Sequence, residues 1–252
     1  MRKSLSAAAG VLTLLAGVAV ASPAQASDRH DDDTAKLSVL HGVPGLTVDV
    51  WVDGKLTLDN FAPGTLAGPL DVPEGHHKIA ITGADATSAD NPVIGPVRVD
   101  LEDGRNYTAV AHLKADGTPT ATLFRNSISP SPDGKGKLTV RHVAAAPAVD
   151  VLAGGKAVIK GLTNSHQKKL TLKAGTVPAA VAAARTTVPV IGPADVPVTE
   201  GKNTIVYAWG SLADNNLGVA VQVVDLRPSE QQRRLTSTIG SRVQPVPVAG
   251  PR

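Results

Sequence analysis

Cysteine is absent from the sequence. No disulfide can therefore stabilise a small domain, and no lipid can be attached through a cysteine after export. Every domain has to be stable through the burial of apolar side chains alone. The chain of 252 residues is long enough for that, because it can form two domains of about 100 residues each.

Aromatic residues and net charge are also scarce. Two Trp, two Tyr and two Phe are present, so the core has to be built mainly from Val, Leu, Ile and Ala. The formal net charge of +3 is too small to indicate a nucleic-acid partner. Aspartates are concentrated in 27–35 and arginines in 227–252. We expect the first to be an acidic N-terminal segment and the second a basic, mostly disordered tail.

One long apolar run is present, and it lies at the N-terminus. Arg2 and Lys3 precede the mostly small, apolar run 6–20, and the sequence A-Q-A follows at 24–26. This order is typical of a secretory signal peptide, here 1–26, which is removed on export. A membrane anchor is the alternative, but the run is shorter than the roughly 20 residues that a spanning helix needs. We expect a secreted, extracellular protein with no transmembrane segment after cleavage, either released or associated with the cell surface.

The same pattern occurs twice in the chain. The stretch KLSVLHGVPGLTVDVWVDGK (36–55) aligns without a gap on KLTVRHVAAAPAVDVLAGGK (137–156), and nine of the twenty positions are identical. The pentapeptide PVIGP follows in both copies, at 92–96 and at 189–193. A period of about 100 residues is that of a whole domain rather than of a solenoid repeat.

The repeat sets the expected domain boundaries. The first domain should span 36–125 and the second 137–226, with the linker 126–136 between them. The linker sequence NSISPSPDGKG is rich in Ser, Pro and Gly, which is typical of a connecting segment.

Inside each copy, apolar residues alternate with polar ones. Short stretches such as TVDVWV and YTAVAHL are separated by turn signals, among them Asp53-Gly54. Strands at about ten-residue spacing indicate an antiparallel sandwich. The expected fold class is therefore all-β, with two tandem antiparallel β-sandwich domains of immunoglobulin-like or transthyretin-like type. The Ala-rich stretch 176–188 could form a helix, but its alignment with the strand-like HHKIAITGADATS favours a strand.

These blocks resemble a known family. The sequence VLHGVPGLTVDVWVDGK, followed by LEDGRNYTAVA, is similar to the approximate pattern V-H-x(6)-V-D-V-Y-V-D-G of the DUF4397 family, with Trp51 in place of the Tyr. The second copy departs from this pattern, because Leu152, Ala153 and Gly154 replace the aromatic-Val-Asp triplet. The resemblance implies two tandem copies of an exported bacterial β-sandwich domain. It implies no reaction and no catalytic residues, because the family has no established activity.

Two residue types recur at matching places in the two copies. His41 is repeated as His142, and Asp49 as Asp150. A His and an Asp on neighbouring strands could form a hydrogen-bonded general-base pair. No serine recurs nearby to act as nucleophile, so we favour structural roles, in which the His closes a buried strand and the Asp accepts hydrogen bonds.

The turn after the second expected strand contains two kinds of candidate residue, those that define the turn and those that could contact a ligand. Gly54 and Gly155 are both expected to define tight turns, because glycine tolerates a positive φ. Asp53 is replaced by Gly154 in the second copy, and Trp51 by a leucine. Trp51 and Asp53 are therefore the candidate ligand-contacting residues of the first domain.

No other pattern defines a reaction centre. His76 and His77 are adjacent, so on a strand they point to opposite faces and seldom bind one metal ion together. We expect no catalytic residues, no metal site and no cofactor. The favoured function is a non-enzymatic module that binds cell-wall polymer or another protein of the bacterial envelope. A structural surface spacer is the alternative, and a secreted hydrolase is a third.

Overall fold

The structure is a computed structural model, and it describes residues 33–230. The expected signal peptide 1–26 lies outside the described residues, as do most of the acidic segment 27–35 and most of the tail 227–252. Between residues 33 and 230, no helix has the length and hydropathy needed to cross a membrane.

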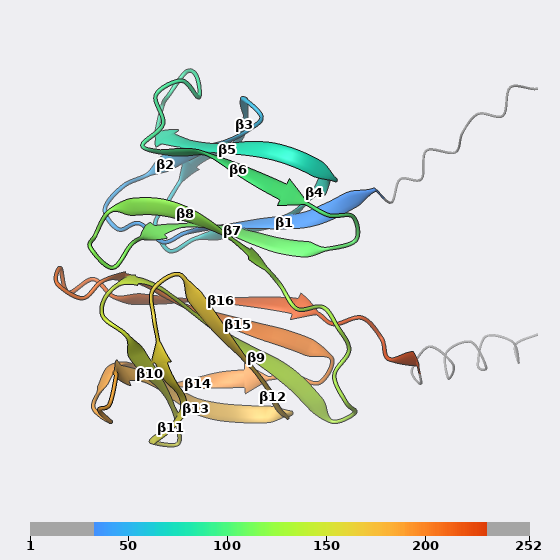
Figure 1. The fold of residues 1–252 in the computed structure, drawn as a ribbon, viewed down its shortest axis with the longest axis vertical. Coiled ribbons are helices and arrows are strands. Elements are labelled where there is room, and N and C mark those ends of the chain that lie inside the picture. The colour runs from blue at the N-terminus through green and yellow to red at the C-terminus, as the bar shows by residue number, and fades with distance from the viewer. Residues whose placement is uncertain (1–32, 231–252) are drawn as a thin grey trace, which may run out of the picture. The chain divides into compact units, whose positions relative to one another are not determined.

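The first half of the described chain forms eight strands. They are β1 (Thr34–His41), β2 (Val48–Val52), β3 (Lys55–Phe61), β4 (Leu66–Pro73), β5 (Gly75–Gly83), β6 (Ile94–Leu101), β7 (Asn106–Leu113) and β8 (Pro119–Arg125). They make two four-stranded sheets, in the orders β4-β1-β7-β8 and β3-β2-β5-β6. We call this half the first sandwich (Figure 1).

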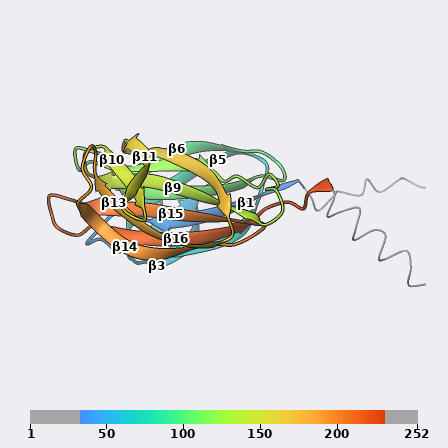
Figure 2. The same ribbon diagram turned by 90° about the horizontal axis from the view of Figure 1, so that it is seen from below.

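The second half also forms eight strands. They are β9 (Lys135–Ala145), β10 (Val149–Ala153), β11 (Lys156–Leu162), β12 (His166–Lys173), β13 (Gly175–Ala183), β14 (Pro189–Val198), β15 (Lys202–Ser211) and β16 (Gly218–Asp225). The sheet orders β12-β9-β15-β16 and β11-β10-β13-β14 repeat those of the first sandwich strand for strand. Figure 2 shows β9, β15 and β16 running side by side in this second sandwich.

The expected class, two β-sandwich domains, is confirmed. In each sandwich one neighbouring pair is parallel, β1 with β7 and β9 with β15, and the other pairs are antiparallel. The strand order differs from that of immunoglobulin constant domains, in which the first strand lies beside the second. Here β1 lies between β4 and β7 instead.

The strand bounds bear on two details of the predicted organisation. Strand β9 begins at Lys135, inside the Gly-rich end of the expected linker 126–136. The Ala-rich stretch forms strand β13 over Gly175–Ala183, and the helix alternative is wrong. Backbone pairing with β10 on one side and β14 on the other outweighs the helix propensity of alanine.

Each sandwich buries an apolar core between its two sheets. In the first sandwich the core includes Leu37, Val50 and Ile81, which are all at most 2% exposed. In the second sandwich Leu138 and Val151 occupy equivalent positions. Burying one such side chain stabilises the fold by about 1.5 to 3 kcal/mol, so cores of this composition can hold each sandwich without disulfides.

The two sandwiches contact each other through the sheets that contain β7 and β15. Residues from both halves form one buried apolar cluster, whose fully or nearly buried members are Leu40, Val110, Phe124, Val143, Ile205, Tyr207 and Val224. The contact explains why the central strands β7 and β9 are buried on both faces. Such strands carry near-continuous small and apolar residues instead of a strict alternation.

A buried arginine lies at the centre of this interface. Arg141 is 0% exposed and donates to three neutral oxygens: Nη1 to the Tyr207 hydroxyl at 2.6 Å, Nη2 to Asn126 Oδ1 at 2.6 Å, and Nε to Gln167 Oε1 at 3.0 Å. Its guanidinium also lies over the rings of Phe124 and Tyr207. Burial lowers the pKa of Arg141, and the Tyr207 hydroxyl acts in the opposite direction. A buried charge is tolerated only when its donors are satisfied, and here dipoles and aromatic faces replace a carboxylate.

The hydrogen bonds continue from Arg141 across the interface. The Tyr207 hydroxyl donates to Gln222 Oε1 at 2.5 Å, and the Thr108 hydroxyl donates to the same oxygen at 2.9 Å. Gln222 Nε2 donates in turn to Ser38 Oγ at 3.1 Å. Thr108 and Ser38 belong to the first sandwich and Gln222 to the second, so the network fixes the two sandwiches to each other.

The linker is part of the folded unit. Lys137 Nζ donates to the hydroxyls of Ser127 and Ser129 at 3.0 and 2.6 Å, and to the Ser129 carbonyl at 2.8 Å. The backbone N–H of Arg227 donates to the carbonyl of Ile128 at 2.8 Å. These contacts hold the connecting segment against the second sandwich.

Candidate functional site

The candidate site is an open groove on the outer face of the sheet β3-β2-β5-β6. Its volume is about 630 Å³. The Asp53-Gly54 turn, residues 76–78 of β5, and Pro96 and Arg98 of β6 line it. We call it the β5–β6 groove. Titratable side chains from different segments line it, among them Asp53, His77 and Arg98.

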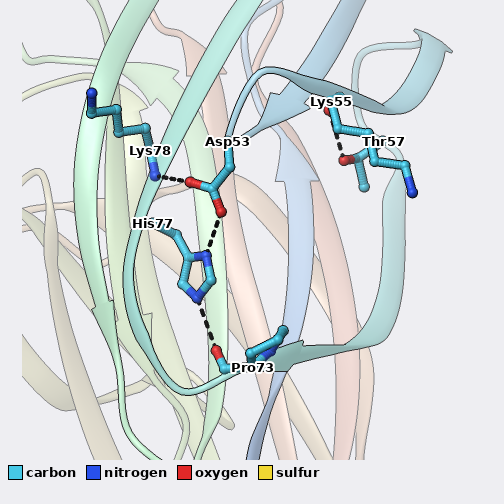
Figure 3. A network of polar contacts seen from close by, with 6 residues as sticks. All are labelled: Asp53, Lys55, Thr57, Pro73, His77 and Lys78. Carbon is cyan, nitrogen blue, oxygen red and sulfur yellow. Dashed lines mark hydrogen bonds and ion pairs between the residues drawn. The ribbon is translucent and has the colours of Figure 1, made fainter. Parts of the chain in front are cut away.

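Asp53 and His77 form a close pair at one side of the groove (Figure 3). His77 Nδ1 lies 2.6 Å from Asp53 Oδ2, and His77 Nε2 lies 2.8 Å from the carbonyl oxygen of Pro73. Asp53 Oδ1 accepts from the backbone N–H of Lys78 at 2.8 Å. The turn before β3 supplies the carboxylate, and the start of β5 supplies the imidazole.

Both ring nitrogens of His77 are donors in this arrangement. A carbonyl oxygen can only accept, so Nε2 carries a proton, and Nδ1 donates to the carboxylate. Burial alone would lower the pKa of His77, but the bonds to Asp53 and Pro73 outweigh it and raise the pKa. The Lys78 N–H, followed by the His77 bond, lowers the pKa of Asp53. Below its raised pKa, His77 therefore forms an ion pair with Asp53, and in that state neither ring nitrogen has a lone pair to act as a general base.

The floor of the groove is cationic. Lys78 of β5 and Arg98 of β6 are directly opposite each other in the register of these strands, and both are exposed. Neither side chain has an ion-pair partner among residues 33–230. Beside them, His76 Nδ1 lies 3.2 Å from Asp100 Oδ1, with both side chains mostly exposed. Like charges at directly opposed positions destabilise a sheet, so the pair of Lys78 and Arg98 lowers the stability of the fold locally.

The second sandwich has none of these groups at the equivalent positions. The start of β13 carries Thr176, Val177 and Pro178 in place of 76–78, and β14 carries Asp195 opposite Pro178. Gly154 stands in place of Asp53. The β5–β6 groove therefore belongs to the first sandwich alone.

The recurring histidines pin the loops that follow the first strand of each sandwich. His41 Nε2 donates to the Leu46 carbonyl at 2.6 Å, and His142 Nε2 donates to the Pro147 carbonyl at 2.9 Å. Burial lowers the pKa of both imidazoles, which are therefore neutral at pH 7. The other nitrogen of His41, Nδ1, is buried without a partner among the described residues.

The recurring aspartates hold a β-bulge in the next strand. Asp49 Oδ1 accepts from the backbone N–H of Asn60 at 2.8 Å, and Asp150 Oδ1 accepts from that of Gly161 at 2.7 Å. Asn60 and Gly161 have φ of 51° and 61° and belong to the extra residues of a register shift. His41 and Asp49 make separate backbone contacts and are not paired with each other.

The two aspartates differ in their second oxygen. Asp150 Oδ2 accepts from the N–H of Arg185 at 2.9 Å, whereas Asp49 Oδ2 is buried and lacks a partner among the described residues. The bonds from Gly161 and then from Arg185 lower the pKa of Asp150. The bulge is thus satisfied more completely in the second sandwich.

The turn residues and Trp51 have simple surroundings. Gly54 and Gly155 have φ of 79° and 78°, and Asp53 and Gly154 before them also have positive φ, as a two-residue hairpin turn requires. Trp51 is 7% exposed, and its Nε1 donates to Thr82 Oγ1 at 3.0 Å. Of the two candidate ligand-contacting residues, Asp53 lines the groove, and Trp51 leaves little surface for a ligand.

Sequence reasoning missed two features. It treated His77 only as a neighbour of His76, although the pairing of Val52 with Ile79 on antiparallel strands brings His77 next to Asp53. It also missed the role of Arg141, for which the signal was the mismatch with Leu40 in the aligned repeat. Within residues 33–230, no three His, Asp or Glu side chains are grouped so that they could hold a metal ion.

Fold and groove together define an all-β, two-sandwich protein with the cationic β5–β6 groove on its first sandwich. Residues 35–152 of this chain match the family described as Domain of unknown function (DUF4397). The matched range covers the first sandwich and continues through the linker into β10. One such domain is detected, without a second copy over β9–β16. No curated protein matches the chain.

Proposed function

We propose that the protein is an exported, non-enzymatic binding module of the bacterial cell envelope, and that its β5–β6 groove binds an anionic envelope polymer. The observation that carries the proposal is the unpaired, cross-strand cation pair of Lys78 and Arg98. An anion between the two side chains would offset their mutual repulsion. Phosphate and carboxylate groups suit both partners, because Arg binds them with two donors and Lys as a point charge.

The non-enzymatic part of the proposal is supported by how the candidate histidines are used. His77 has both nitrogens engaged, and His41 and His142 donate to backbone carbonyls. Asp49 and Asp150 accept from backbone N–H groups. These roles maintain the fold, and none presents a free base to a substrate.

Export and duplication complete the proposal. The order of charged, apolar and small residues in 1–26 supports a cleaved signal peptide and a secreted or surface-associated product. The second sandwich is proposed to be a second DUF4397 copy. The strand order shared by β1–β8 and β9–β16, and the repeated contacts of His142 and Asp150, support that relationship.

A structural spacer is the second candidate. The hydrogen bonds of Gln222 with Thr108 and Ser38, which continue the network of Arg141, favour it, because a fixed contact between the two sandwiches is what a rigid spacer needs. The spacer has no requirement for the cation pair in the groove.

The test is retention of the mature chain by purified envelope at low salt. We expect Lys78→Glu combined with Arg98→Glu to lose most of the retention. The control is Lys168→Glu combined with Lys173→Glu on β12, which makes the same change of charge on the second sandwich. Equal retention of the two double variants would contradict the groove assignment, and no retention of the parent chain would favour the spacer.

Two further experiments distinguish the possible binding partners and binding elements. If protease treatment of the envelope abolishes retention, the partner is an envelope protein and the polymer assignment is wrong. If deletion of 231–252 alone abolishes retention and its salt dependence, the basic tail rather than the groove is the binding element.

A further inference from the structure

Strand β16 differs from the other strands at the edges of the described sheets. Edge strands expose unpaired backbone groups, and proteins commonly protect them with proline, lysine, bulges or cover. Strands β4, β6 and β14 contain prolines, β3 and β11 contain bulges, and β12 carries three lysines. Strand β8 begins with a proline and contacts β6.

Proline, lysine and bulges are all absent from β16, and no strand within residues 33–230 pairs with its outer edge. Its sequence, GVAVQVVD, has no proline and no lysine, and it pairs with β15 without a register shift from Gly218 to Asp225. The strand is therefore regular along its length. Its outer edge can accept another strand.

One face of β16 also carries a row of exposed valines. Val219, Val221 and Val223 are 45%, 48% and 57% exposed. The equivalent residues of β8 include Ala121 and Leu123, which are half-buried and pack against the core of the first sandwich. The contact between β6 and β8 covers these side chains in the first sandwich, whereas the valines of β16 remain exposed in the second. Apolar residues in a row on an unprotected edge are typical of an interaction surface.

We propose that two copies of this chain pair antiparallel through β16, so that their sheets β12-β9-β15-β16 join into one continuous sheet. The valine row is symmetric about Val221, which makes the strand complementary to itself. In antiparallel pairing centred there, Val219 faces Val223 of the second copy and Val221 faces its own equivalent. Such a two-fold contact uses the same surface of both subunits.

Charge also favours a second copy. The one charged residue of β16 is Asp225, and it forms an ion pair with Lys202 of its own chain. In the proposed register Asp225 faces Leu217 of the second copy, so no like charges are opposed. The resulting dimer is joined through the sheet β12-β9-β15-β16, whereas the β5–β6 groove of each copy lies on the sheet β3-β2-β5-β6.

The first experiment measures the mass of the mature chain by sedimentation as a function of concentration. We expect a monomer–dimer equilibrium that Val221→Lys abolishes, because the two introduced ammonium groups would face each other. The control is Val158→Lys on β11, a similarly exposed valine, which should leave the dimer unchanged. A monomer at every concentration, or an unaffected dimer in Val221→Lys, would overturn the proposal.

A second variant keeps the test valid if the lysine variant does not fold. Because the chain has no cysteine, Val221→Cys introduces a single thiol. Opposed residues of antiparallel strands have Cα atoms about 4.5 to 5.5 Å apart, a separation that a disulfide can span. Oxidation should yield a covalent dimer of Val221→Cys and leave Val158→Cys monomeric. Equal cross-linking of the two variants would contradict the pairing.

Discussion

The first and second sandwiches have the same strand order, but their residues differ on the outer face and at the interface between the two sandwiches. On the outer face, the first sandwich carries Lys78 opposite Arg98, and the second carries Pro178 opposite Asp195. At the interface, Leu40 of the first sandwich is equivalent to Arg141 of the second. What is common to both maintains the fold, and what differs belongs to one sandwich's own contacts.

The common features are local and involve the backbone. A histidine pins the loop after the first strand, an aspartate holds a bulge, and a glycine with positive φ completes the hairpin. The histidine and the aspartate satisfy polar backbone groups that the sandwich would otherwise bury without partners, and the glycine adopts the backbone conformation that the turn requires. The duplicated positions are therefore structural, and the positions that changed are the place to look for function.

The largest expected effect concerns the interface. Arg141→Ala should lower the free energy of unfolding by about 3 to 5 kcal/mol, because it leaves a cavity beside Phe124 and Tyr207 and buried oxygens without donors. Arg141→Leu, which copies Leu40, should lose less because it keeps apolar contacts. Urea unfolding of both variants at pH 7 checks this order, and a loss under 1 kcal/mol in Arg141→Ala would show that the network is dispensable.

The next largest effect is expected at the two β-bulges, where the loss of stability on removal of each aspartate can be compared. Asp150→Ala should lower the melting temperature more than Asp49→Ala, because Asp150 satisfies two backbone N–H groups and Asp49 one. Removal of Asp49 also removes a buried oxygen without a partner. Calorimetry at neutral pH measures both. Equal losses would mean that the second hydrogen bond of Asp150 contributes nothing, and the reverse order would contradict the comparison.

A smaller effect depends on pH. The pKa of His77 is raised in the folded protein, so its contribution to stability is complete below the ordinary value of about 6.5 and is lost as pH rises through the raised pKa. His77→Gln should therefore destabilise the protein more at pH 6 than at pH 9. Urea unfolding at the two pH values is the measurement.

His112 provides the opposite case as a control. Burial lowers its pKa, and the nearby His142 lowers it further against the bond to the Leu113 carbonyl. Its contribution is present above about pH 6.5 and is lost as pH falls through the lowered pKa. His112→Gln should therefore destabilise more at pH 9 than at pH 6. The same pH trend in both variants would contradict the assigned protonation states.

The smallest effect should be equal in the two sandwiches. Gly54→Ala and Gly155→Ala each place a side chain at a φ near 79° with no atom within 4 Å of the new Cβ. Backbone strain alone should lower the free energy of unfolding by about 1 kcal/mol in each case. Chemical denaturation compares them, and a clear difference would mean that the two turns are not equivalent.

Much of the fold was predictable from the sequence, because period-two patterns and an aligned repeat are local signals. The strand β13 was recognised in spite of its alanines through its alignment with β5. The contact between the sandwiches was not predictable. In a strand that is buried on both faces, the sequence does not distinguish the face that packs on its own core from the face that contacts the other sandwich. Arg141 stood out only as a mismatch with Leu40.

The candidate site was predictable in part. Asp53 was singled out because the second sandwich lacks it, and it does line the groove. The contribution of His77, Lys78 and Arg98 depends on strand register, which brings together residues from three segments of the chain. The strand register could not be predicted from the repeat. Alignment of the two copies identifies equivalent positions, but it does not show which residues are neighbours on adjacent strands.

The central claim is that the first sandwich alone carries an anion-binding groove. Titration of the mature chain with short-chain inorganic polyphosphate, followed by backbone amide chemical shifts, tests it residue by residue. We expect changes concentrated at 76–80 and 97–98, and none at the equivalent residues 176–177, 179–180 and 194–195; the prolines between them have no amide proton. Changes confined to the second sandwich, or no saturable change in either, would contradict the account.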